Sequence, residues 1–335
     1  MTVEGSAAEG RVKIPVKLPV KIVVPGDHPI QIAGSPHLDK LEPYGEVVLY
    51  SDRPASSEEK VKRAADAEVI MNTRGSVQWG EEEFQRLPKL KLIALCSIGT
   101  DMIDLEAARR RGITVCNQPG RTAPVVAEHL FGMMFALSKR AAFFTSEVKA
   151  GKWPRENNIM LQGKVLGVIG TGAIGAEMAR LARAIGMEVI AWTFHPSAER
   201  AQKLGVRYAG LDELLKTSDV VSLHVAGSEK TRQMIGRREL DLMKPGALLV
   251  TGARGAIVDT AALADALHSG RLAGAAVDVY DDEPPPPGHP LFACEQIVLT
   301  PHCADMTPEG VELLNSGVVE NVIAFLKGRP RNQAT

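Results

Sequence analysis

The clearest indication of the fold of this chain is in residues 164–192, KVLGVIGTGAIGAEMARLARAIGMEVIAW. It begins with an apolar β-branched run, turns through the glycine pattern G-x-G-x-x-G, continues as an amphipathic helix and ends in a second apolar run. Glycines at that spacing, between a strand and a helix, are typical of a loop that holds a pyrophosphate on the helix N-terminus. The stretch therefore predicts a βαβ unit that binds a dinucleotide.

Each glycine of this pattern has its own expected role. Gly170 allows a tight turn, Gly172 lets the pyrophosphate approach the backbone, and Gly175 lets the helix pack closely on the strand. Ala173 and Ile174 lie between the second and third glycines and complete the predicted cofactor-binding loop.

The identity of the dinucleotide depends on the residues at the end of the next strand. A carboxylate there commonly accepts the ribose 2′-hydroxyl of NAD, but this chain has Thr193 at the corresponding place. No negative charge would repel the 2′-phosphate of NADP, while Arg200 follows only several residues later. The predicted cofactor is therefore NAD or NADP, and both remain open.

Outside this stretch, short β-branched runs alternate with longer helical runs, which is typical of parallel sheets. The predicted strands form a first series at 21–26, 46–50, 68–72, 90–97 and 113–117, and a second at 164–170, 188–192, 220–225, 247–252, 275–280 and 296–300. We expect one long helix over 124–150 between the series and a C-terminal helix over 307–327. Two such series predict an α/β fold of two doubly wound parallel-sheet domains with an active-site cleft between them.

The composition limits the classes of function. The 335 residues suffice for two domains, and 39 Lys+Arg against 40 Asp+Glu leave a formal net charge of -1. That balance argues against a nucleic-acid or membrane binder, and no apolar run approaches the roughly 18 residues that span a bilayer. The four cysteines lie far apart without metal-ligand spacing, so we expect reduced thiols, a cytoplasmic protein and no metal. Residues 1–19 carry no targeting pattern and are expected to be a frayed leader.

Three polar segments follow predicted strands of the second series. They are Ala253-Arg254-Gly255-Ala256-Ile257-Val258-Asp259, Asp278-Val279-Tyr280-Asp281-Asp282-Glu283-Pro284 and Leu299-Thr300-Pro301-His302. All three lie at the carboxyl ends of parallel strands, where ligands bind in open α/β sheets. Together with the glycine loop, these segments resemble the D-2-hydroxyacid dehydrogenase family over about residues 21–327.

The resemblance implies hydride transfer between a nicotinamide cofactor and a small 2-oxo acid or D-2-hydroxyacid. Arg254 offers a planar fork that can bind a carboxylate or a carbonyl oxygen. His302 is the only residue of the three segments that is an acid and a base near neutral pH, and Glu283 beside it would raise its pKa. By resemblance, Arg254 binds the substrate, and Glu283 and His302 relay the proton.

The resemblance also implies further contacts, domain roles and a partner. The expected cofactor contacts include His224, Gly252, Ala253 and Asp278, and the expected substrate contacts are Asn72, Thr73, Arg74, Ser97, Ile98 and Gly99. A Rossmann cofactor domain is expected over 117–303, and a flavodoxin-like substrate-binding domain over 20–116 plus 304–335. The apolar helix over 124–150 needs more cover than one domain gives, which predicts a homodimer through the cofactor domains.

Some positions depart from the family pattern and leave an alternative open. Thr251 stands where Asn is usual, and Cys303-Ala304-Asp305 follow His302 in place of an apolar residue and two glycines. None of these changes removes a catalytic group, so they bear on the substrate. The alternative is a dinucleotide-sensing protein of the corepressor type, since such proteins keep the fold and the catalytic set. Formate dehydrogenases of this fold have Gln where Glu283 stands, which disfavours that activity.

Overall fold

The structure is a computed structural model that describes residues 19–75 and 77–335. The described residues form two compact units: the first runs up to Arg121 and includes Val311–Thr335, and the second is Thr122–Gly310. The units divide a few residues later than the boundaries expected at 116 and 303, because Gln118 and Arg121 donate hydrogen bonds to the C-terminal helix of the first unit. The predicted leader lies outside the described residues, apart from residue 19.

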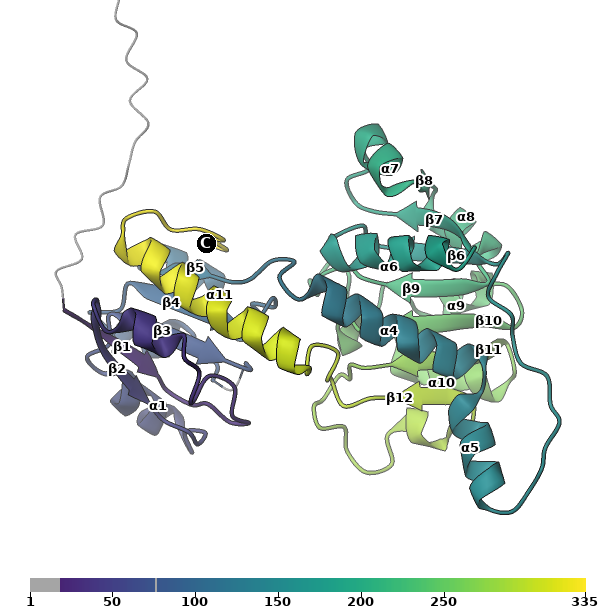
Figure 1. The fold of residues 1–335 in the computed structure, drawn as a ribbon, viewed down its shortest axis with the longest axis horizontal. Coiled ribbons are helices and arrows are strands. Elements are labelled where there is room, and N and C mark those ends of the chain that lie inside the picture. Colours follow the sequence, from purple (N-terminus) through teal and green to yellow (C-terminus); the bar gives the residue numbers. More distant parts are fainter. Residues whose placement is uncertain (1–18, 76) are drawn as a thin grey trace, which may run out of the picture. The chain divides into compact units, whose positions relative to one another are not determined.

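The first unit contains a sheet of five parallel strands (Figure 1). The strands are β1 (Val20–Val24), β2 (Gly45–Leu49), β3 (Val69–Thr73), β4 (Leu92–Cys96) and β5 (Thr114–Cys116). Their order is β2-β1-β3-β4-β5, the flavodoxin-like order, so the direction of winding reverses between β1 and β3. Strands β3 and β4 are buried along their whole length, as expected for parallel strands with helices on both faces.

Helices cover both faces of this sheet. They are α1 (Ser57–Ala64), α2 (Glu81–Gln85) and α3 (Leu105–Arg110) on one face, and the 3-10 helix η1 (Leu38–Leu41) with α11 (Pro308–Leu326) on the other. Alternate residues of β1 divide between the two faces: Val23 packs in the cluster of Phe84, while Val24 packs in the cluster of Phe325. The first unit is therefore a three-layer α/β/α fold.

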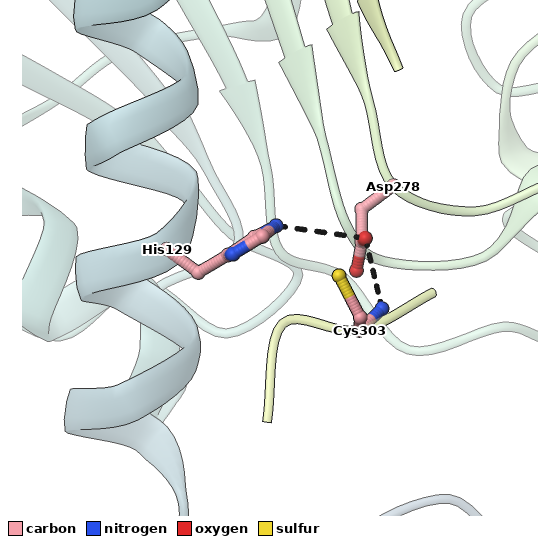
Figure 2. A group of neighbouring side chains, drawn as sticks. All are labelled: His129, Asp278 and Cys303. Atoms are coloured by element: carbon pink, nitrogen blue, oxygen red, sulfur yellow. Dashed lines mark hydrogen bonds and ion pairs between the residues drawn. The ribbon is translucent and has the colours of Figure 1, made fainter. Parts of the chain in front are cut away.

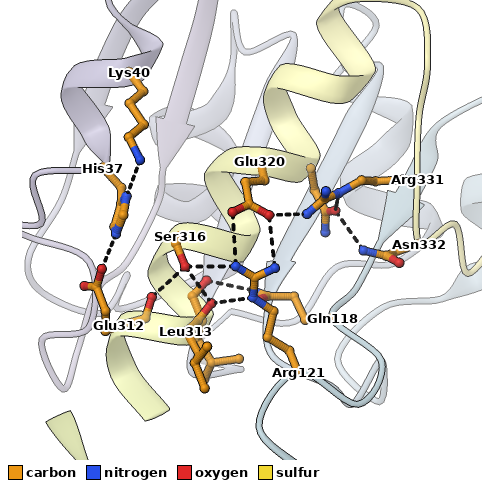
Figure 3. A network of polar contacts seen from close by, with 12 residues as sticks. His37, Lys40, Gln118, Arg121, Glu312, Leu313, Ser316, Glu320, Arg331 and Asn332 are labelled. Atoms are coloured by element: carbon orange, nitrogen blue, oxygen red, sulfur yellow. Dashed lines mark hydrogen bonds and ion pairs between the residues drawn. The ribbon is translucent and has the colours of Figure 1, made fainter. Parts of the chain in front are cut away.

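Hydrogen bonds hold α11 to the segment that follows β5 (Figure 3). The Arg121 guanidinium donates to both carboxylate oxygens of Glu320, at 3.0 and 3.1 Å, and to the Leu313 carbonyl at 2.9 Å. The Gln118 amide donates to the Leu314 carbonyl at 2.9 Å. Because two-pronged Arg–carboxylate pairs add geometric definition to their strength, this network fixes the helix on the sheet.

The second unit contains a sheet of seven parallel strands. They are β6 (Val165–Ile169), β7 (Glu188–Trp192), β8 (Arg207–Tyr208), β9 (Val220–Leu223), β10 (Ala247–Thr251), β11 (Leu272–Val277) and β12 (Ile297–Leu299). Their order is β12-β11-β10-β9-β6-β7-β8, which is the Rossmann order with one further strand. The prediction missed β8, whose two residues are too few to show a period.

Helices also cover both faces of the second sheet. They include α4 (Ala123–Ser138) and α6 (Ala173–Ala184) on one face, and α8 (Leu211–Thr217), α9 (Arg237–Leu242) and α10 (Thr260–His268) on the other. The shorter elements are α5 (Ala141–Lys149), α7 (Ala198–Leu204), η2 (Gly255–Ile257) and η3 (Pro290–Ala293). The two α/β domains with parallel sheets that the sequence predicted are thus confirmed.

The prediction of a single helix over 124–150 is wrong. The helix breaks after α4, where Arg140 adopts a left-handed backbone conformation with φ of 50° and α5 begins at a new angle. The Arg140 guanidinium lies over the Phe143 ring and pairs with Glu156, contacts that favour the turn over a continuous helix. No helix in the described part of the chain is long and apolar enough to cross a membrane.

Candidate functional site

The glycine loop after β6 has the geometry that a pyrophosphate requires. Gly170 has a φ of +97°, and a Cβ on it would lie 2.8 Å from the His224 carbonyl group. A Cβ on Gly175 would lie only 2.0 Å from the Gly170 carbonyl oxygen, so helix α6 can approach β6 only without a side chain there.

Gly172 differs from the other two glycines because it faces open space. It caps the N-terminus of α6, and a Cβ on it would meet no atom of the described chain within 4 Å. The first backbone N–H groups of a helix have no partner inside the helix, and here they have room for an anion. Exposed Ala173 and half-buried Ile174 form the first turn beside it. The loop therefore fits a dinucleotide at the point where the winding of the sheet reverses, between β6 and β9.

The end of β7 brings a cation to the glycine loop. Thr193 is half-buried, and Arg200 of α7 donates a hydrogen bond from its guanidinium to the Thr171 carbonyl oxygen. The Thr171 hydroxyl in turn bonds to the Tyr208 hydroxyl at 3.0 Å. From the sequence alone, Arg200 follows the strand end by several residues, so its contact with the cofactor loop could not be predicted. In the structure, the turn into α7 places Arg200 against that loop.

The other expected cofactor residues lie at the ends of neighbouring strands. His224 bonds to the Ser222 hydroxyl at 2.8 Å, and burial lowers the pKa of His224 to about 3, so this imidazole is neutral. Gly252 follows β10, and a Cβ on it would lie 2.6 Å from Leu130. The Ala253 carbonyl oxygen accepts a hydrogen bond from Arg254 at 2.7 Å.

Glu283 and His302, 19 residues apart in sequence, form a close pair. The distance from His302 Nδ1 to Glu283 Oε2 is 2.6 Å, and the other Glu283 oxygen accepts from the Tyr280 N–H at 3.1 Å. This hydrogen bond raises the pKa of His302 above its ordinary value. Partial burial alone would raise the pKa of Glu283, but the hydrogen bond from His302 lowers it overall. The Glu283 carboxylate therefore stabilises the protonated form of the His302 imidazole.

The backbone of His302 is held in an uncommon conformation. Its φ of 49° lies in the left-handed region, which residues with a side chain adopt at a cost of about 1 to 3 kcal/mol. The His302 N–H donates to the Asp278 carbonyl at 2.8 Å, so the strand end before it fixes the turn. Such strain is concentrated at functional sites, and here it directs the imidazole toward Glu283.

Arg254 lies close enough to act on this pair. Its side chain is half-buried after β10, and its positive charge lowers the pKa of Glu283 and opposes the protonation of His302. The structure therefore brings the three expected catalytic residues together within one unit, at the carboxyl ends of β10, β11 and β12.

Asp278 is completely buried, and Figure 2 shows it beside His129 and Cys303. One carboxylate oxygen accepts from the Thr300 hydroxyl at 2.5 Å and from the Cys303 N–H at 3.0 Å, and it lies 3.6 Å from His129 Nε2. The other oxygen accepts from the Ala304 N–H at 3.2 Å. Burial alone would raise the pKa of Asp278, but the contacts with His129 and Thr300 lower it. Sequence reasoning missed both partners: Thr300 lies two residues before His302, but nothing around His129 signals a role.

The expected substrate residues lie in the first unit, where Asn72 and Thr73 are buried and the other four are partly exposed. The Asn72 amide donates to the Val77 carbonyl at 2.9 Å, and the Thr73 hydroxyl donates to the Gly26 carbonyl at 3.0 Å. Arg74 follows with a φ of 49° and a half-buried side chain. Ser97, Ile98 and Gly99 form a turn that is closed by the Ser97 hydroxyl, which donates to the Gly99 carbonyl at 2.9 Å. Arg74 and the Ser97–Gly99 turn, which are partly exposed, are thus the groups of this set that can meet a ligand.

Comparison with known proteins agrees with this geometry. Residues 131–304 match the family model of the D-isomer specific 2-hydroxyacid dehydrogenase, NAD binding domain. A glyoxylate reductase of Korarchaeum cryptofilum is 37% identical over 298 residues, which cover 87% of this chain and 90% of that protein. A D-3-phosphoglycerate dehydrogenase of Archaeoglobus fulgidus is 38% identical over 281 residues, 83% of this chain, but the match spans about half of that protein, 53%.

A solved structure shows the same fold over nearly the whole chain. The crystal structure of a glyoxylate reductase from Paecilomyes thermophila superposes with a TM-score of 0.87 at 29% identity, covering 95% of this chain and 99% of that one. The chain therefore belongs to the D-isomer specific 2-hydroxyacid dehydrogenase family, oxidoreductases that act on CH–OH donors and contain a nicotinamide-dinucleotide-binding domain.

Proposed function

We propose that this protein reduces a small 2-oxo acid to the D-2-hydroxyacid, or catalyses the reverse reaction, with His302 and Glu283 relaying the proton. The observation that carries the proposal is the 2.6 Å contact between these two side chains beside Arg254, in the same unit as the glycine loop. When bound, the dihydronicotinamide supplies a hydride to the carbonyl carbon. The protein has to bind the acid, place the carbonyl and deliver a proton to its oxygen.

His302 is the proton donor of this proposal. Its Nδ1 is engaged with Glu283, which leaves Nε2 as the nitrogen that can face the substrate carbonyl. The carboxylate favours the imidazolium, so the ring carries the proton that oxo-acid reduction consumes. In the reverse direction the neutral ring accepts the hydroxyl proton, and Glu283 stabilises the charge that forms.

Arg254 binds the substrate in this proposal. Its guanidinium presents several N–H groups in one plane, which suits the carboxylate or the carbonyl oxygen of a 2-oxo acid. We assign the first unit, with Arg74 and the Ser97–Gly99 turn, as the substrate-binding domain, and the second unit as the cofactor domain. The half-buried Arg74 and the backbone N–H groups of the turn support a second anchor for the carboxylate.

NADP(H) is the cofactor that the region after β7 favours. Thr193 brings no negative charge, and Arg200 lies against the Thr171 carbonyl of the glycine loop, beside the place where the adenine ribose is expected. A guanidinium there can pair with a 2′-phosphate. NAD(H) would bind without this contact.

The exposed α5 segment supports a homodimer. None of the residues of α5 is buried, and Trp153 after it is 76% exposed. A second copy of the chain could cover this apolar surface through the cofactor domain. Light scattering at micromolar concentration should give twice the mass of one chain. The mass of a single chain would contradict the dimer. The four free thiols support a reducing, cytoplasmic location.

The test of the activity is the loss of NADPH and NADH absorbance with a panel of small, phosphorylated and aryl 2-oxo acids. We expect turnover with at least one acid, and a fall in kcat by about 10²- to 10⁴-fold in His302→Ala, the usual contribution of general acid catalysis. Arg254→Ala should also lose turnover, and both variants should still bind dinucleotide. His268→Ala, at the exposed end of α10, is the matched control and should keep wild-type turnover.

Two outcomes would decide against the proposal. Near-normal turnover in His302→Ala or Arg254→Ala would refute the assigned roles. Tight dinucleotide binding without turnover on any acid of the panel would favour the dinucleotide-sensing alternative.

A further inference from the structure

Three side chains that can bind a metal ion lie close together beside the Glu283–His302 pair, and each comes from a different helix or strand end. His129 comes from α4, Asp278 follows β11 and Cys303 follows β12, as Figure 2 shows. One ligand atom from each side chain lies within 4.8 Å of the corresponding atoms of the other two. We propose that His129, Asp278 and Cys303 form a binding site for Zn²⁺, and that an ion bound there excludes the nicotinamide end of the dinucleotide.

The donor types and their spacing suit zinc. Imidazole nitrogen, thiolate sulfur and carboxylate oxygen are its usual protein ligands, and zinc arranges them tetrahedrally at about 2.0 to 2.3 Å, which puts neighbouring ligand atoms about 3.3 to 3.6 Å apart. His129 Nε2 and Asp278 Oδ1 are already 3.6 Å apart. The Cys303 sulfur lies within 4.8 Å of the ligand atoms of the other two residues, and rotation about its side-chain bond can bring it closer to them. Three protein ligands leave a fourth position for water.

The surroundings of Asp278 resemble the outer shell of a metal-binding carboxylate. The Thr300 hydroxyl and the N–H groups of Cys303 and Ala304 hold its two oxygens in place. Ligating carboxylates are commonly fixed by hydrogen bonds in this way. Asp278 is 0% exposed, so a divalent cation would also compensate a buried negative charge.

An ion can reach this cluster from solvent. The His129 side chain is 24% exposed, and Cys303 is partly exposed. The chain offers a contrast in Cys294, which lies 3.9 Å from His268 Nε2, because that thiol is buried and the pair belongs to no three-donor cluster among the described residues. Cys294 is therefore the matched control for Cys303.

The exclusion of the dinucleotide rests on the proposed function together with the cofactor contact that the family resemblance implies for Asp278, which would place the nicotinamide beside this carboxylate. Asp278 already accepts three hydrogen bonds, so an ion bound to it would use the acceptor capacity that the carboxylate has left, and the water on the ion would fill the space in front of it. Zinc and dinucleotide would then compete, and the apparent Kd for NADPH would rise in proportion to the zinc concentration.

The first experiment titrates the purified protein with Co²⁺, a spectroscopic substitute for zinc, and uses no cofactor. We expect a thiolate-to-cobalt charge-transfer band that added Zn²⁺ removes. Cys303→Ser should abolish the band, Cys294→Ser should keep it, and His129→Ala should weaken cobalt binding roughly tenfold or more, since even outer-shell changes cost that much. Circular dichroism checks the fold of each variant. The absence of the band in the wild type, or its persistence in Cys303→Ser, would overturn the site.

The second experiment measures NADPH binding by fluorescence, with and without Zn²⁺. Zinc should weaken binding to the wild type and to Cys294→Ser, but not to Cys303→Ser. A cobalt band together with zinc-independent NADPH binding would overturn the competition and leave the site standing. If no dinucleotide binds even without zinc, the proposed function and the competition both fail, while the cobalt titration still decides the site.

Discussion

Two alanine substitutions in the glycine loop should affect different properties, because Gly172 and Gly175 lack side chains for different reasons. Gly175→Ala should lower the stability of the fold, and Gly172→Ala should weaken dinucleotide binding. In Gly175→Ala the new Cβ would lie 2.0 Å from the Gly170 carbonyl oxygen and 3.1 Å from a Val168 methyl group, so α6 must move away from β6. Overpacking of this kind costs about 1 to 3 kcal/mol. At about 2 to 4 °C per kcal/mol for a unit of this size, the Tm should fall by about 2 to 12 °C.

In Gly172→Ala the Cβ meets no atom within 4 Å, and the φ of −64° is one that alanine adopts freely. The entropy that alanine removes from the unfolded chain is offset by the loss of glycine at an N-cap, so stability should change by less than about 1 kcal/mol. The methyl group would stand where the pyrophosphate approaches the backbone. Losing two charge-assisted hydrogen bonds, about 3 kcal/mol, should raise the Kd for NADPH by about 100-fold.

Thermal unfolding and fluorescence titration with NADPH measure the two effects separately. Gly175→Ala should have a lower Tm than the wild type, while Gly172→Ala should keep the wild-type Tm and bind NADPH more weakly. If Gly172→Ala binds NADPH as tightly as the wild type, the pyrophosphate does not lie on the N-terminus of α6.

Three further predictions concern single side chains. Arg200→Ala should raise the KM for NADPH about tenfold or more, the value of one charge-assisted hydrogen bond, and leave the KM for NADH unchanged; equal effects on both would contradict a 2′-phosphate contact. Glu283→Gln should lower kcat about 10²-fold with little change in dinucleotide affinity, and stopped-flow single turnovers would show whether the chemical step is the one affected. Glu83 in the first unit accepts hydrogen bonds from Lys60, Ser57 and the Gly80 N–H, which lower its pKa to about 2 despite the opposing effect of burial. Its contribution to stability is therefore present above pH 4.5 and lost as the pH falls toward 2. In Glu83→Gln the free energy of unfolding, measured by urea titration, should fall less between pH 4.5 and pH 2 than in the wild type, by up to about 3 kcal/mol. The same fall in both proteins would contradict this.

The sequence predicts most of the fold because the relevant signals are local. Each strand–loop–helix unit carries its own apolar period and its own turn residues, so 11 predicted strands are present in the two sheets. The break between α4 and α5 could not be predicted, since it depends on the backbone angle of Arg140 and on its contacts with Phe143 and Glu156.

In the candidate site, too, some residues are predicted by local sequence motifs and others are brought together only by packing. The glycine loop is a local motif, and the Glu283–His302 pair follows from a family pattern. The approach of Arg200 to the loop depends on the turn between β7 and α7, and the meeting of His129 with Cys303 brings together residues far apart in sequence. No spacing rule for metal ligands detects a cluster of that kind, because only the packed helix α4 places His129 beside the strand ends.

The first unit is discontinuous in sequence, and this affects how the protein is made. During synthesis its last strand, β5, emerges with Cys116, but α11, which covers one face of that sheet, ends only at Leu326. At about 5 to 20 residues per second, the ribosome needs roughly 10 to 40 s to make the intervening chain. The second unit, whose core extends to Ala304, is completed within that interval, while an apolar sheet surface of the first unit remains bare on the nascent chain. Chaperones that act on nascent chains would meet this protein at that surface.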